Sequence, residues 1–240
     1  MFKIFLYECK RLLCNKFIFG ILLILLFYSW QVLSNITILG VSYTAPFSAW
    51  SFGDYLSRMI PLLWIEALFF LTFFLSPRAR RVAILTNATQ ASPCWYAMAR
   101  CAAALVGIGL LALVCFAEAA VFYAGYFEWY ECGNLLLPAL VTLTPPLVFT
   151  LGSGWLLGQI KTWLLYVWMI IPFVCMALPL PEVLGLWNGS FFTEYPLTLG
   201  TFDPAFSMPV SIILVQCVLF VCGIILLLYR FRKNKVADKN

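Results

Sequence analysis

Six long apolar runs, separated by shorter polar or aromatic segments, dominate the pattern of this 240-residue chain. A helix that crosses the hydrocarbon core of a bilayer needs roughly 20 mostly apolar residues. The runs that meet this length are 17–39, 56–76, 101–127, 135–158, 163–180 and 209–230. They are continuous and lack the period-two alternation of a membrane β-barrel. The pattern therefore predicts an all-α membrane protein with six transmembrane helices.

The first 16 residues have a different, amphipathic pattern. Lys3, Glu8, Lys10 and Arg11 lie largely off a stripe of apolar residues at helical spacing, which consists of Phe2, Phe5, Leu6, Cys9, Leu12 and Leu13. This predicts an interfacial helix with its cations at anionic lipid headgroups. A cleaved secretory signal is disfavoured, because the next apolar run is long and no small-x-small cleavage site is evident.

Two connections are long enough to carry function. The positive loop 77–100 is too charged for the bilayer, and its residues 79–91 suit a short helix at the membrane surface. The segment 181–208 mixes aromatic residues with Gly, Asn and Pro, and we expect short helices that dip into the opposite interface in a reentrant-like manner. The predicted organisation is thus an interfacial helix (1–16), a transmembrane domain (17–230) and a basic tail (231–240).

Composition and charge agree with a membrane protein and indicate its orientation. The chain is 64% hydrophobic and 10% charged, whereas soluble domains are about a quarter charged. Placing the N-terminus in the cytoplasm puts 14 of the 15 Lys and Arg residues on that side, with Arg58 as the exception. The positive-inside rule then predicts that both termini are cytoplasmic. Because these cations border apolar runs, they do not indicate a nucleic-acid partner.

Residues for catalysis or metal binding are missing from the sequence. There is no histidine, and the nine cysteines form no Cys-x-x-Cys pair, so they are best interpreted as small apolar fillers. No phosphate-binding Gly-x-x-x-x-Gly-Lys-Ser/Thr motif occurs. We therefore predict no catalytic residue, no metal site, no cofactor and no enzymatic activity in this chain.

Two carboxylates, Glu66 and Glu118, fall inside predicted spans. A charge near the bilayer centre costs on the order of 3 kcal/mol on insertion scales. Each group should therefore be protonated, face the bundle interior or line a polar cavity. Both lie about ten residues from the outer end of their span, so they are candidates for a polar path at similar depth; the plainer interpretation is a carboxyl group bonded to a neighbouring helix.

Helix-modifying residues mark the fourth run. Pro145-Pro146 predicts a kink or a break there. Gly154 and Gly158 form a small-xxx-small pattern, which permits close helix contact but is common in membrane helices.

The order of these parts resembles the membrane subunit of a type-2 ABC exporter: an amphipathic helix before the first span, a cytoplasmic loop with a short helix between the second and third spans, and a reentrant-like segment before the sixth. In residues, the resemblance rests on 1–19 and on Arg80-Arg81-Val82-Ala83-Ile84-Leu85-Thr86 through Ser92-Pro93 to Arg100. The family's loop often carries an acidic residue and a glycine ahead of this stretch, and this chain has neither.

The resemblance implies a coupling helix in the loop, with Arg78, Arg80, Arg81, Ile84, Leu85 and Thr86 as its contact residues. It also implies a cytoplasmic ATP-binding cassette subunit that alone binds ATP, a second permease half in a homodimer or heterodimer, and a bacterial cytoplasmic membrane. The alternative is a transporter or channel that needs no ATPase and uses Glu66 and Glu118 for proton coupling. The loop arginines are also explained by topology alone.

Overall fold

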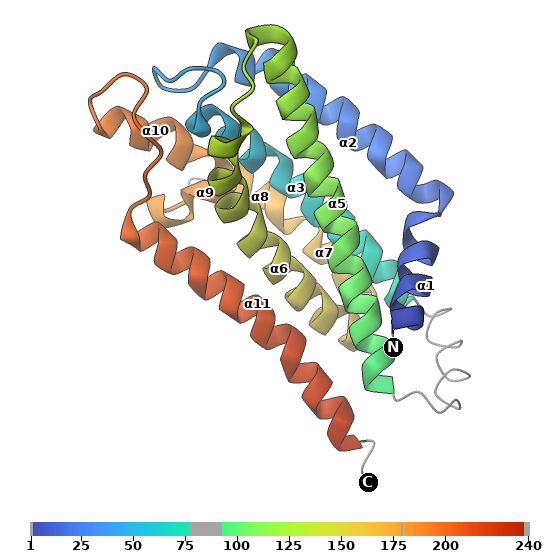
Figure 1. Cartoon of the computed structure of the whole chain (residues 1–240). Coiled ribbons are helices and arrows are strands. Elements are labelled where there is room, and N and C mark those ends of the chain that lie inside the picture. Colours follow the sequence, from blue (N-terminus) through green and yellow to red (C-terminus); the bar gives the residue numbers. More distant parts are fainter. Residues whose placement is uncertain (1, 77–92, 179, 238–240) are drawn as a thin grey trace.

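The computed structural model describes residues 2–76, 93–178 and 180–237, and within these ranges all regular secondary structure is helical (Figure 1). Each helix is bounded as follows: α1 Phe2–Leu13, α2 Lys16–Asn35, η1 Thr37–Leu39, α3 Ala49–Leu75, α5 Pro93–Phe127, η2 Cys132–Leu135, α6 Leu136–Ile160, α7 Trp163–Trp168, α8 Ile171–Ala177, η3 Glu182–Leu184, α9 Gly185–Asn188, α10 Ser190–Thr198 and α11 Val210–Ala237. The all-helical prediction is confirmed for this part of the chain.

Five helical segments of the described chain are long and apolar enough to cross a membrane. They are Lys16–Leu39, Ala49–Leu75, Trp95–Phe127, Cys132–Ile160 and Val210–Leu228. These helices indicate a multi-pass membrane protein.

The predicted fifth span, 163–180, is not confirmed as a single helix. Its apolar stretch Trp163–Ala177 is divided into α7 and α8. Pro172, at the start of α8, lacks the backbone N–H that would continue α7. At 1.5 Å per residue, this stretch covers about 22 Å, short of a hydrocarbon core of about 30 Å. The chain nevertheless returns through α7–α10 to the start of α11, and the N-terminus and the end of α11 lie at the same end of the bundle (Figure 1).

Helix α3 is the centre of the bundle. Most of its residues are buried, including the large Trp50, Tyr55 and Trp64. It packs against α6 on one side and α5 on another, while α11 packs against α6 and α2 against α5. Helices α2 and α11 bury one narrow stripe each and expose apolar residues elsewhere, such as Phe27 and Leu214. Exposed apolar faces of this kind suit contact with lipid.

Glycines set the closest helix contacts around α6. A Cβ added at Gly154 or Gly158 would overlap leucines of α3 and, at Gly158, Leu165. The small-xxx-small pattern is therefore used within the chain. Gly152 lies against Gly223 of α11, so closely that an added Cβ would overlap the Gly223 backbone. This α6–α11 crossing had no counterpart in the sequence prediction.

The two prolines of α6 do not break it. The helix is continuous from Leu136 to Ile160 with Pro145 and Pro146 inside. Because proline has no N–H, the carbonyl groups four residues earlier, at Val141 and Thr142, lose their helical donors. Helix α6 therefore carries two backbone acceptors outside the usual ladder without being interrupted.

The N-terminal unit is a helix, as predicted, but its charged residues are not all outside the packed face. Glu8 is 1% exposed and lies beside the buried Cys9 and Leu12. Helix α1 packs on α5, where Glu8 pairs with Arg100. The expectation that Glu8 lies off the packed stripe is therefore wrong, because an ion pair with a second helix allows the carboxylate to be buried.

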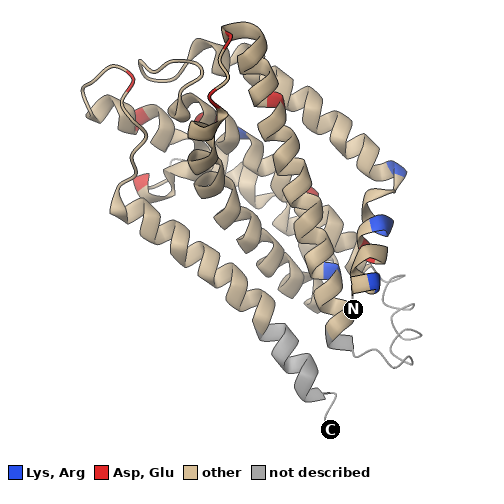
Figure 2. Ribbon diagram, viewed as in Figure 1, with Lys and Arg blue, Asp and Glu red and all other residues tan. Residues whose placement is uncertain are grey.

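Charged residues are distributed unevenly along the bundle. Figure 2 shows most of the described Lys and Arg residues near the end that holds both termini, and most Asp and Glu residues towards the opposite end. This segregation follows the pattern from which a cytoplasmic location of both termini was predicted.

Candidate functional site

A cluster of polar side chains joins α2, α3 and α5 inside the bundle. The hydroxyl groups of Ser29 and Tyr55 are 2.7 Å apart, and Tyr55 donates to the backbone carbonyl of Cys115 at 3.0 Å. Ser29 also lies beside Glu118, whose Oε2 is buried with no partner among the described residues. Glu118 was predicted from the sequence, whereas Ser29 is an ordinary residue of the first predicted span and Tyr55 directly precedes the second, so neither could be identified from the sequence.

Glu66 lies apart from this cluster. It is 2% exposed, and neither carboxyl oxygen has a hydrogen-bond partner in the part of the chain that the structure describes. Tyr55 of the cluster lies eleven residues earlier on α3, about 16 Å along the helix axis. Cys115 is near enough to interact electrostatically with both Glu66 and Glu118. Both carboxyl groups are therefore in the neighbourhood of Cys115, and no hydrogen bond between them is found among the described residues.

A buried ion pair, between Asp54 and Arg58, lies near the start of α3. It was not predicted from the sequence. Asp54 precedes the predicted span 56–76, but α3 starts at Ala49, so this residue lies in the second turn of the helix and is 2% exposed. Its Oδ2 accepts a hydrogen bond from Arg58 Nε at 2.9 Å. The i, i+4 spacing of opposite charges was the available signal. Because a buried carboxylate needs a partner, Arg58 is explained by Asp54 and its outlying position does not weigh against the predicted orientation.

The connection between α9 and α10 closes over this ion pair. Gly189 has φ of +82°, which favours glycine, and a Cβ there would lie 2.7 Å from Asp54 Oδ1 and 2.9 Å from Ser57 Oγ. Trp187 packs on Trp64 with ring centroids 5.3 Å apart. The segment 181–208 therefore contains short helices, as expected, and their side chains insert between the long helices.

Helices α6 and α11 form an apolar groove with one buried amide. The groove has a volume of about 510 Å³. Gln216 lines it and is 3% exposed, and neither its Oε1 nor its Nε2 has a partner among the described residues. Thr142 Oγ1 on α6 is likewise buried and unpartnered there. Since Pro145 and Pro146 free backbone acceptors on the same helix, α6 and α11 together carry unused hydrogen-bonding capacity at membrane depth.

The predicted coupling residues Arg78, Arg80, Arg81, Ile84, Leu85 and Thr86 lie outside the described residues. The predicted loop 77–100 is too long at its C-terminal end, because α5 begins at Pro93 and residues 93–100 are helical. The two helices that border residues 77–92 each make a side-chain contact with another helix or its cap. Arg100 pairs with Glu8 of α1, and the Leu75 carbonyl accepts a hydrogen bond from Thr162 at 3.4 Å. Within 2–76, 93–178 and 180–237, no group of three or more His, Cys, Asp or Glu residues is placed to hold a metal ion.

Comparison with protein-family models, with curated proteins and with solved structures found no match.

Proposed function

We propose that this chain is the membrane-spanning permease subunit of an ABC exporter. The observation that carries the proposal is that both helices bordering the positive segment 77–92 are tied to further helices. Helix α5 is tied through Arg100 to the amphipathic helix α1, and the end of α3 through Leu75 to the start of α7. A force applied to the loop would therefore reach α1, α3, α5 and α7 together, as a subunit driven by a separate motor requires.

Unpartnered polar groups inside the bundle support transport in general. Glu66, Thr142 and Gln216 lie on three helices, and each is almost completely buried with hydrogen-bonding atoms unused among the described residues. Leaving such groups unpaired costs about 1–3 kcal/mol each, and polar groups in membrane helices commonly mark a substrate path. A cargo, water or a second permease half would satisfy them in the working state.

The proposed assembly follows from this assignment. A cytoplasmic ATP-binding cassette subunit binds ATP and contacts Arg78, Arg80, Arg81, Ile84, Leu85 and Thr86. Two permease halves, identical or similar, enclose one path, in the cytoplasmic membrane of a bacterium. Both termini face the cytoplasm, in agreement with the gathering of cations at that end. In this arrangement α7–α10 provide the fifth of six passages, and α11 provides the sixth.

The test is co-purification from native membranes in mild detergents, with an affinity tag on the C-terminal tail, followed by mass spectrometry. Wild type is compared with Arg80→Glu/Arg81→Glu. The matched control is Lys233→Glu/Lys235→Glu, which makes the same charge change on the tail. A soluble ATPase that is retained by wild type and the control, and lost from the loop variant, supports the proposal; its absence from wild type in several detergents refutes it.

A proton-coupled transporter without an ATPase is the second candidate, and Glu66 is the observation that favours it. A buried carboxyl group with both oxygens unpartnered can exchange a proton without first breaking an ion pair. Uptake into proteoliposomes driven by an imposed proton gradient tests this candidate. It is contradicted if Glu66→Gln and Glu118→Gln leave transport unchanged across pH.

A further inference from the structure

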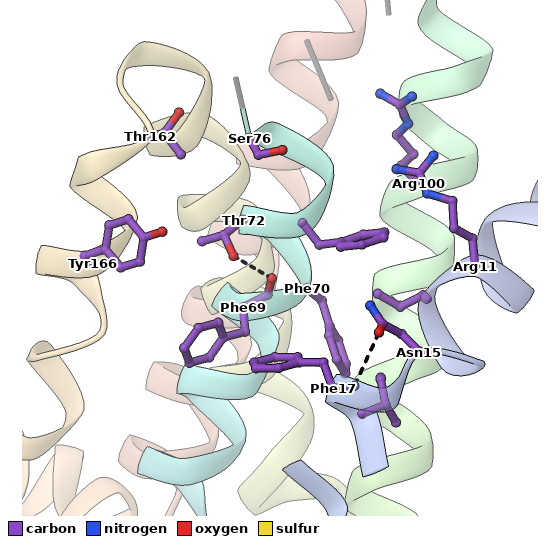
Figure 3. A pocket seen from close by; sticks show the side chains of 13 residues that line it. Arg11, Asn15, Phe17, Phe69, Phe70, Thr72, Ser76, Arg100, Thr162 and Tyr166 are labelled. Atoms are coloured by element: carbon purple, nitrogen blue, oxygen red, sulfur yellow. Dashed lines mark hydrogen bonds between the residues drawn. The ribbon is translucent and has the colours of Figure 1, made fainter. Parts of the chain in front are cut away.

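A pocket lies where the amphipathic helix meets the bundle. It has a volume of about 620 Å³ and is lined from α1, α2, α3, α5 and α7, together with the short connections beside them. Figure 3 shows Arg11 and Arg100 close together on one side of it, and the rings of Phe17 and Phe69 on another. One side of the pocket is therefore cationic and the other is aromatic.

The cationic side carries an excess of one positive charge. Glu8 lies between the two arginines, with its Oε2 3.3 Å from Arg11 and its Oε1 3.3 Å from Arg100 Nε. Two guanidinium groups thus share one carboxylate. Each guanidinium has five N–H donors in a planar fork, so the shared carboxylate leaves most of them available. Arg11 is 32% exposed and Arg100 is 12% exposed, which keeps these donors accessible from the pocket.

The arginines are held in position by their surroundings. The Arg11 guanidinium stacks on the Phe73 ring at 4.9 Å, and that of Arg100 on Tyr96 at 5.5 Å. Arginine forks match phosphate oxygens in geometry. A pair that is fixed before binding loses less side-chain entropy when an anion arrives.

We propose that this pocket binds one anionic phospholipid, with its phosphate at Arg11 and Arg100 and its acyl chains along the phenylalanine wall. The aromatic side of the pocket, formed by Phe17 and Phe69 and called here the phenylalanine wall, favours a lipid over a soluble phosphate. Phe17 is half-exposed and lies at the start of α2, the first membrane-crossing helix, so the wall continues into the face that meets the acyl chains. A ligand with a charged head and an apolar body satisfies both sides, and it is available at this depth in any anionic leaflet.

This proposal is independent of the transport mechanism and goes beyond a general attraction of the α1 cations to headgroups. It assigns the contact to Arg11 and Arg100 and excludes the neighbouring Lys10, which is exposed and does not line the pocket. Lys10 therefore provides a control on the same helix with the same charge.

The experiment is native mass spectrometry of the full chain, titrated with phosphatidylglycerol and, separately, with phosphatidylcholine of the same acyl chains. The readout is the ratio of the two affinities within one variant, so that a loosened fold that weakens both lipids does not imitate the effect. Arg11→Gln should lower the ratio about fivefold, the effect of roughly one interfacial charge. Lys10→Gln should leave it unchanged. Glu8→Gln, which removes the competing carboxylate, should raise it.

The wild-type protein alone can overturn the proposal. Equal binding of phosphatidylglycerol and phosphatidylcholine would exclude the site. Failure to retain either lipid would also exclude it, and would be expected if another part of the protein occupied the pocket. Displacement of phosphatidylglycerol by millimolar inorganic phosphate would show a soluble-anion site instead. Equal effects of Arg11→Gln and Lys10→Gln would show that the lipid is attracted by the general positive charge of α1 and not bound in the pocket.

Discussion

Replacing Gly223 with alanine should destabilise the protein, because the added methyl group forces α11 and α6 apart. A Cβ at this position would lie 2.8 Å from both Phe149 N and Val148 C, and ordinary contact begins at 3.4 Å. These neighbours belong to the backbone of a continuous helix, so they cannot rotate away as a side chain would. The two helices must therefore separate by about 0.6 Å at the crossing.

The magnitude follows from the packing that this separation removes. A gap of 0.5–1 Å forfeits roughly a quarter to a half of each dispersion contact, and overpacking of a tight core costs about 1–3 kcal/mol. Alanine also gains about 1 kcal/mol over glycine in helix propensity. The free energy of unfolding of Gly223→Ala should therefore fall by a small to moderate amount. Comparison with the same substitution at a glycine in open surroundings separates the packing effect from the gain in helix propensity.

Gly109 on α5 provides that comparison, because nothing lies within 4 Å of a Cβ added there. The free energy of unfolding would be measured by titration with sodium dodecyl sulfate in mixed micelles, followed by circular dichroism. Gly109→Ala should be neutral or stabilising, and Gly223→Ala less stable than Gly109→Ala by about 1–3 kcal/mol. Equal stability of the two variants would show that the α6–α11 crossing is looser than described.

Three further predictions concern buried charges and the N-terminal helix. Arg58→Ala should lower the free energy of unfolding by about 2–4 kcal/mol, because Asp54 stays buried without its partner; in the same titration, adding Asp54→Asn should restore part of the loss. Glu8→Ala should accelerate amide hydrogen exchange throughout α1, since the ion pair that holds this helix on α5 is lost; unchanged exchange would mean that apolar contacts alone hold it. Burial, reinforced by the adjacent Glu8 carboxylate, raises the pKa of the Cys9 thiol. Less thiolate is then present at pH 8, so alkylation of Cys9 should be slower than that of the exposed Cys14 and should accelerate as the pH rises; equal rates at pH 8 would contradict the burial of Cys9.

The sequence by itself determined the solvent and the class of fold. Each long apolar run became a helix or helices, because lipid offers no partner for backbone N–H and C=O groups and a helix satisfies them within one segment. The amphipathic start of the chain and the short helices between 181 and 208 were also predictable, since their residue periods and turn residues are local properties. The cations, counted along the chain, already predicted the segregation that Figure 2 shows.

Only the tertiary structure decided which polar residues are buried and what they meet. Glu8 looked like a surface charge and Asp54 like a loop residue, but each is buried because a cation on the same or a neighbouring helix pairs with it. Glu118 gained Ser29, whereas Glu66 gained no partner within the described chain. The close contact of Gly152 with Gly223 joins residues 71 positions apart in sequence. Such pairings depend on how helices are rotated and placed relative to one another, which apolar side chains of similar size in a bilayer do not specify from one span alone.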